Sequence, residues 1–168
     1  MGSTLHWREP PDRDARDFET FLEFGRGGRS GTGFMAYSER SGPGVLVLQP
    51  PPSWRDAALD FARAVRDDGF TVLVPDLDGS GADPVRLKAA AEYLVDNWHP
   101  RLGVVGFGDA VALAGQLAEE RACDALVLYC RDEVGTSSSR APILRQPSDT
   151  AIDASDEETL EFLRYHLS

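Results

Sequence analysis

The sequence is short of cysteine and lysine and contains no long apolar run. Its two cysteines, Cys123 and Cys130, flank one predicted strand, so we expect free thiols rather than a disulfide framework. No stretch of about 18 apolar residues is available to span a membrane, and the first residues lack the apolar segment of a secretory signal. The 17 basic residues include a single lysine, Lys88, which is typical of a GC-rich bacterial genome. These absences favour a cytoplasmic protein that does not cross a membrane.

Positive charge is also scarce. The formal net charge is −11 over 168 residues. Phosphate groups would be repelled, so we expect neither a nucleic-acid partner nor binding to an anionic membrane surface. The histidines, cysteines and carboxylates show no metal-ligand spacing, so we expect no metal and no cofactor.

What the sequence does contain is a regular alternation of apolar runs and amphipathic segments. Residues 1–17 are polar and are expected to form an arm, and residues 18–168 are expected to form one domain. Two short apolar runs around a glycine-rich turn, within residues 20–37, predict a β-hairpin. The strands that follow are expected at 44–49, 70–76, 102–107 and 124–130, and the helices at 53–69, 83–98, 109–122 and 155–167. This order predicts an α/β fold with a mostly parallel sheet flanked by helices.

The alternation weakens after Cys130. The next 25 or so residues offer one short apolar piece, "APIL", among serine, proline and glycine. We therefore expect the sheet to be shortened at this end. An edge left uncovered there would offer a surface to a second copy of the chain or to another protein, because unpaired strand edges favour pairing.

In a parallel α/β sheet, ligands bind beyond the carboxyl ends of the strands. The residues predicted at those ends are Gln49, Pro50, Asp78, Gly108, Asp109 and Cys130. Four of them have a structural alternative: Gln49 can bond its own loop, Asp78 can form a turn, Asp109 can complement a helix dipole, and Cys130 can be a small buried residue. The pattern alone does not decide between these roles and a ligand pocket.

Five segments between residues 31 and 130 occur in an order and spacing that resemble the dienelactone hydrolase family of the α/β-hydrolase superfamily. They are "GTGFMAY", "GPGVLVLQ", "FARAVRDDGFTVLVPDLD", "GVVGFGDAVALAG" and "DALVLYC". The predicted final helix, 156–167, is similar to the closing helix of the family. The resemblance implies a nucleophile elbow after the 102–107 strand, where a cysteine on a tight turn attacks a carbonyl.

The catalytic residues that the resemblance implies are not found at their places. The elbow of the family reads G-F-C-x-G-G, whereas residues 106–111 read G-F-G-D-A-V, so Gly108 stands at the nucleophile position. Pro50 stands where the family has a glutamate, and Ser80 where it has an arginine. We expect the 38 residues after Cys130 to be too few to supply the strands that carry the acid and the histidine of the family. The histidines present, His6, His99 and His166, do not match the catalytic position.

These differences predict a catalytically degenerate protein that is not a classical ester or lactone hydrolase. The first hypothesis is a small-molecule-binding or accessory protein for an acyl ligand. The second is a repurposed isomerase, cyclase or lyase on an acyl or polyketide-like substrate, with elbow N–H groups stabilising an oxyanion and Asp109 as acid or base. The third is a hydrolase with Cys130 as a relocated nucleophile. An enclosed pocket over a buried Asp109 would favour the second hypothesis.

Overall fold

The computed structural model describes most of the chain outside its amino-terminal residues. The described residues are 18–24, 31–38, 42–50, 56–77, 84–120, 123–129, 141–146 and 157–167. The arm expected at residues 1–17 lies outside these ranges and stays a prediction.

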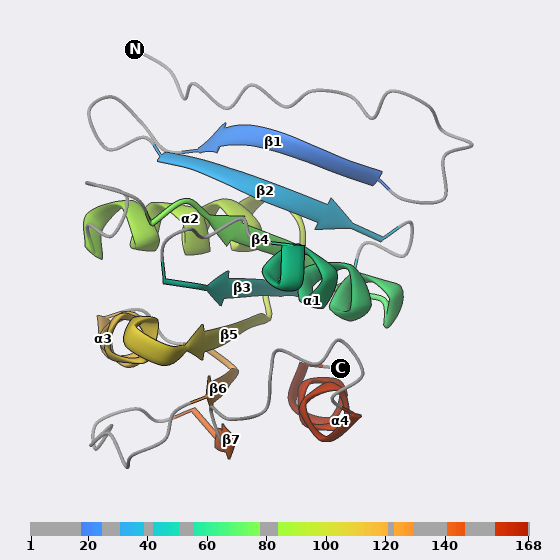
Figure 1. Cartoon of the computed structure of the whole chain (residues 1–168), viewed down its shortest axis with the longest axis vertical. Helices are drawn as coiled ribbons and strands as arrows, with labels where there is room; N and C mark the ends of the chain where they lie inside the picture. The colour runs from blue at the N-terminus through green and yellow to red at the C-terminus, as the bar shows by residue number, and fades with distance from the viewer. Residues whose placement is uncertain are drawn as a thin grey trace.

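Within the described residues, one seven-stranded sheet forms the centre of the molecule, in the order β1-β2-β4-β3-β5-β6-β7 (Figure 1). The strands are β1 (Phe18–Phe24), β2 (Gly31–Tyr37), β3 (Gly44–Leu48), β4 (Thr71–Pro75), β5 (Leu102–Phe107), β6 (Ala125–Tyr129) and β7 (Ile143–Gln146). Strand β1 pairs antiparallel with β2, and β2 pairs antiparallel with β4. The remaining strands of the sheet, β4, β3, β5, β6 and β7, run parallel to one another. The mostly parallel sheet and the amino-terminal hairpin are therefore confirmed.

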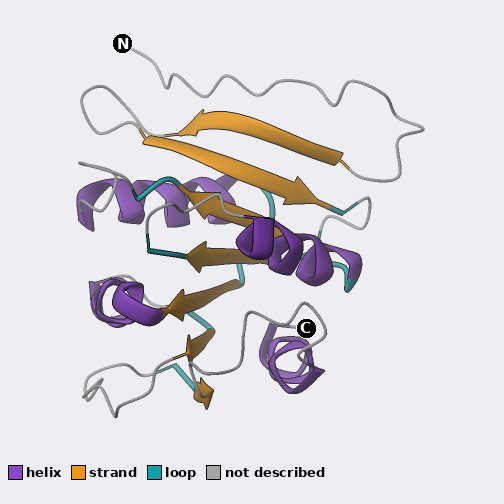
Figure 2. Ribbon diagram, viewed as in Figure 1, coloured by secondary structure: helices purple, strands orange, loops and turns teal. Residues whose placement is uncertain are grey.

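Helices cover both faces of the sheet (Figure 2). On one face lie α1 (Asp56–Asp67) and α4 (Glu157–Leu167), and on the other lie α2 (Pro84–Asn97) and α3 (Val111–Glu120). Because both faces are covered, every residue of β3, β4, β5 and β6 is buried, which explains their continuous apolar sequences. Among the described residues, no helix is both long and apolar enough to cross a membrane.

The sheet continues one strand further than the sequence predicts. Strand β7 pairs in parallel with β6, from Leu126 opposite Ile143 to Tyr129 opposite Gln146. Its sequence does not predict it, because it has only two apolar residues, followed by Arg145 and Gln146, and a short edge strand of this kind resembles a loop in its pattern. Among the described strands, the one at this edge of the sheet is consequently β7 rather than β6.

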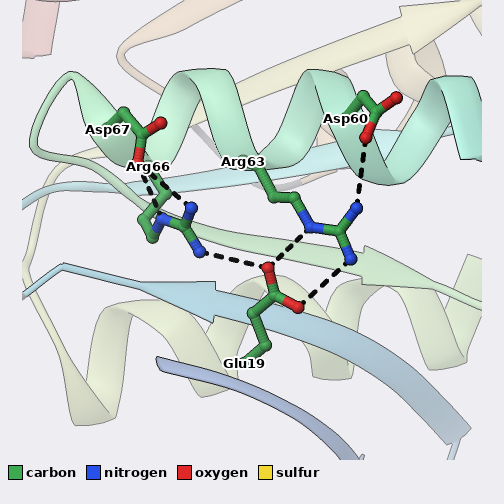
Figure 3. A network of polar contacts seen from close by, with 5 residues as sticks. All are labelled: Glu19, Asp60, Arg63, Arg66 and Asp67. Atoms are coloured by element: carbon green, nitrogen blue, oxygen red, sulfur yellow. Dashed lines mark hydrogen bonds and ion pairs between the residues drawn. The ribbon is translucent and has the colours of Figure 1, made fainter. Parts of the chain in front are cut away.

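A network of charged residues fastens the edge strand β1 to helix α1 (Figure 3). The Arg63 guanidinium donates two hydrogen bonds to the Glu19 carboxylate, with Nε 2.6 Å from Oε1 and Nη2 3.2 Å from Oε2. Arg66 donates from Nη1 to the same Oε1 at 3.2 Å, and its side chain is only 5% exposed. The bond from Arg63 lowers the pKa of the Glu19 carboxyl below its ordinary value. Glu19 therefore holds two helix arginines to the hairpin.

Candidate functional site

Strand β5 ends in a tight turn that leads directly into a helix. Gly108 follows the strand with φ +53°, in the left-handed region that glycine adopts without strain. The turn continues as a short 3-10 helix, Gly108–Ala110, which runs into α3 at Val111. The predicted helix start at residue 109 is thus a 3-10 turn, and the strand, turn and helix have the arrangement of a nucleophile elbow.

A second glycine brings helix α3 close to the strand. A methyl group placed on Gly106 would lie 2.7 Å from Cβ of Ala114, closer than carbon atoms can approach. The absence of a side chain at Gly106 therefore lets the first turns of α3 pack against β5, which fixes the direction in which the helix leaves the elbow.

Position 108 itself has room for a side chain. A Cβ atom on Gly108 would have Pro50 Cγ as its nearest neighbour among the described residues, at 3.6 Å, which is an ordinary contact distance. Gly108 and Asp109 are both exposed, and Pro50 is partly exposed. The elbow is thus open at the point where the family resemblance implies a nucleophile.

Asp109 lies in the first turn after the strand, beside the free N–H groups of the helix start. Its exposure fits a carboxylate that complements the helix dipole. The acid or base role expected of it would require burial, and the exposed position does not supply that.

Gln49 lies at the carboxyl end of the neighbouring strand. Leu48 pairs with Gly106, so Gln49 and Phe107 are the next residues along two adjacent parallel strands. Its side chain is 1% exposed, whereas Pro50, one residue on, reaches the surface beside Gly108. The structure therefore brings Pro50 and Gly108 together at the elbow and buries Gln49.

Two of the predicted site residues, Asp78 and Cys130, lie outside the described ranges, so their placement at the site stays a prediction. Asp76, two residues before Asp78, is described, and its backbone N–H donates to the Thr32 carbonyl oxygen at 2.9 Å. That bond ties the end of β4 to the hairpin.

The two described histidines lie at the other end of β5. The Arg101 backbone N–H, directly before the strand, donates to Nδ1 of His99 at 3.1 Å. The Arg101 side chain donates from Nη1 to the backbone oxygen of His166 at 3.3 Å. Neither histidine is therefore next to Gly108, and His6 lies outside the described residues.

Three aromatic rings pack together next to the elbow, and no sequence pattern predicts them as a group. Phe107 stacks on Tyr129, with ring centroids 4.4 Å apart and 13° between the planes. Phe61 of α1 meets Phe107 edge-on at 5.1 Å. The contact between Phe107 and Tyr129 could have been expected from the sequence, because the two residues end adjacent parallel strands and lie opposite each other.

Other kinds of site are not seen in the described part of the chain. No group of three or more histidine, cysteine, aspartate or glutamate side chains there could hold a metal ion. A shallow crevice lies between α2 and α3 and is lined by Pro84, Leu87, Leu113, Gln116 and Leu117. None of the site residues that the sequence predicts is among the residues lining this crevice.

No protein-family profile and no curated protein matches the chain significantly. Solved structures do match. A dienelactone hydrolase from Anabaena variabilis is 14% identical with a TM-score of 0.70, and the match covers 91% of this chain and 100% of that one. A dienelactone hydrolase-like promiscuous phosphotriesterase from metagenomic libraries is 20% identical with a TM-score of 0.64, covering 90% and 77%. The esterase domain of a Rhodothermus marinus protein is 20% identical with a TM-score of 0.58, covering 66% and 49%. The chain therefore has the α/β-hydrolase fold, in the form seen in dienelactone hydrolase-like and esterase structures.

Proposed function

We propose that this protein binds a small acyl compound at the elbow, as a binding or accessory protein, and does not hydrolyse esters through a covalent intermediate. The observation that carries the proposal is Gly108, which keeps the left-handed backbone of an elbow at φ +53° without a side chain to attack a carbonyl. A backbone conformation that is retained without its nucleophile fits a binding role better than a catalytic one.

The open space at Gly108 supports a ligand at the same place. A ligand atom could occupy the position that a nucleophile side chain would take, in contact with Pro50. The free N–H groups at the start of the helix would then donate hydrogen bonds to an oxygen of the ligand.

Charge favours an uncharged acyl group over a carboxylate. Asp109 is exposed beside the same N–H groups, and the chain has a net charge of −11. Both would repel an anion, whereas a lactone or ester carbonyl accepts the same hydrogen bonds without a charge. The ligand class that the site suits best is therefore a neutral ester or lactone.

Hydrolysis assays test the loss of covalent chemistry. Purified protein is mixed with p-nitrophenyl acetate, p-nitrophenyl butyrate and a p-nitrophenyl phosphotriester, with Gly108→Ala as the matched control. We expect the wild type and Gly108→Ala to release p-nitrophenolate equally slowly. With the two carboxylic esters, we expect the thiol of Gly108→Cys to be acylated once to a thioester, with release of one equivalent of p-nitrophenolate, and the reaction then to stop.

Turnover by the wild type would overturn the proposal, and two further variants identify its source. Loss of turnover in Cys130→Ser would assign the reaction to a relocated nucleophile. Loss in Asp109→Asn would assign it to acid–base chemistry at the elbow.

A further inference from the structure

The carboxyl-terminal helix α4 is connected to the elbow through buried side chains. Thr159, in the first turn of α4, is fully buried, and its Oγ1 lies 2.5 Å from the Tyr129 hydroxyl oxygen in a hydrogen bond. Tyr129 is the last residue of β6, and its ring stacks on Phe107 at 4.4 Å. Phe107 directly precedes Gly108. Two side-chain contacts and one peptide bond thus lead from α4 to the elbow.

The aromatic rings leave little freedom for independent movement. Phe61, Phe107 and Tyr129 are 2%, 6% and 3% exposed. Phe61 stands edge-on to both other rings, at 5.1 Å from Phe107 and 6.2 Å from Tyr129. Because close-packed rings cannot shift singly, a displacement of Tyr129 is passed on to Phe107.

The start of the elbow helix has no side-chain cap to hold it. Phe107 occupies the N-cap position with an extended backbone, φ −119° and ψ 137°, and it makes no side-chain hydrogen bond to the helix. Helix starts are commonly fixed by a serine, threonine or aspartate at this place. A phenyl ring cannot accept those hydrogen bonds, but Phe107 is itself held by its ring contacts with Phe61 and Tyr129.

We propose that Thr159 and Tyr129 are positioning residues for the elbow, so that the docking of α4 sets the geometry of residues 108–110. The proposal goes beyond the proposed function and relies on it only in treating the elbow as the binding site. By thermodynamic reciprocity, a ligand that favours the observed elbow will also favour docked α4.

The test uses the full-length protein without ligand and records backbone amide resonances by NMR. Thr159→Val removes the hydroxyl and keeps the shape, and Thr159→Ser keeps the hydroxyl. Tyr129→Phe removes the phenol oxygen, with Tyr165→Phe as its control because Tyr165 lies on α4 and is 81% exposed. We expect Thr159→Val and Tyr129→Phe to move the resonances of Gly108, Asp109 and Ala110, and the two controls to leave them in place.

Hydrogen exchange gives the size of the effect. We expect amides of α4 to exchange about three- to tenfold faster in Thr159→Val, as for the loss of one buried hydrogen bond. In a Phe107→Leu background, Thr159→Val should no longer move the Gly108 resonance, because the connecting ring is gone.

Two results would overturn the coupling. One is faster exchange in α4 with elbow resonances unchanged, which would make the hydroxyl pair purely a fastening of the helix. The other is an equal shift of Gly108 by Thr159→Val with and without Phe107. Neither result depends on whether the elbow binds a ligand, so failure here is distinct from failure of the proposed function.

Discussion

Gly106 and Gly108, two residues apart, serve the elbow in different ways. Gly108 is needed for its backbone conformation, since a side chain there has room but the positive φ is unfavourable for it. Gly106 is needed for its small size, since a methyl group would collide with Ala114. The sequence identifies the first role through the family resemblance, but the second requires knowing where α3 lies.

The first prediction compares alanine at the two positions. Gly108→Ala should lower the free energy of unfolding by about 1–2 kcal/mol, the cost of a left-handed residue with a side chain. Gly106→Ala should cost about 1–3 kcal/mol through overpacking, and Ala114→Gly should recover part of that loss by making space. Urea unfolding followed by circular dichroism measures these variants and Ala114→Gly alone, because a glycine inside α3 has a cost of its own. An equal cost of Gly106→Ala in the wild-type and Ala114→Gly backgrounds would show that the close approach is not what makes Gly106 necessary.

The second prediction concerns Glu19 and pH. Its pKa is lowered in the folded state from an ordinary value of 4.5, chiefly by the hydrogen bond from Arg63. Its contribution to stability is therefore complete above that ordinary value and is lost as the pH falls through the folded-state pKa. Glu19→Gln should be about 1–2 kcal/mol less stable than the wild type at pH 7, and the difference should shrink below about pH 4.

Glu23→Gln is the control for Glu19→Gln, because Glu23 lies on the same strand with an exposed side chain. Glu23→Gln should change the free energy of unfolding by less than about 0.5 kcal/mol, both at pH 7 and below about pH 4. A Glu19→Gln deficit that stays constant down to pH 3 would mean that packing, and not the ion pairs to α1, accounts for the loss.

At the scale of elements, helix α4 is held by an apolar face as well as by its hydroxyl contact. Leu163 and Leu167 are fully buried and lie over Gly103 of β5, where a Cβ atom would be 3.2 Å and 2.9 Å from their methyl carbons. Outside this face, Arg164 donates hydrogen bonds to the Asp68 carboxylate at the end of α1 and to Glu157, which raises the pKa of its guanidinium.

The third prediction follows from that apolar face. Leu163→Ala should lower the free energy of unfolding by about 2–5 kcal/mol, because it leaves a cavity between α4 and the sheet. Glu161→Ala, on the exposed side of the same helix, should cost less than about 0.5 kcal/mol. Equal and small losses in both variants, measured by urea unfolding, would contradict the docking of α4 on β5.

The central strands and the helices could be predicted from the sequence, whereas the last strand could not. Strands β3 to β6 are continuous apolar runs, and helices such as α1 repeat apolar residues at helical spacing. Strand β7 has a half-exposed pattern, and its place depends on pairing with β6 rather than on its own residues. The local sequence pattern contains the apolar periodicity of a helix or strand, but it does not contain the pairing between strands.

At the scale of the whole molecule, the fold brings distant residues into the same sites. Glu19 meets Arg63 across 44 positions of sequence, and Tyr129 meets Thr159 across 30. Such pairs have no local signature, so the sequence predicts the turn at Gly108 but neither the charged network nor the contact of α4 with Tyr129. Asp78 and Cys130 stay predictions of the site.

The most direct test of the account is an NMR titration of the protein with δ-valerolactone and, separately, with 5-hydroxypentanoate, the anion that its hydrolysis would give. We predict saturable shifts of the Gly108 and Asp109 amide resonances with the lactone and none with the anion, since the carboxylate of Asp109 repels it. Asp109→Asn should then admit the anion. The absence of a saturable shift with the lactone, or its opening to the hydroxy acid faster than in buffer, would contradict a binding role for the elbow.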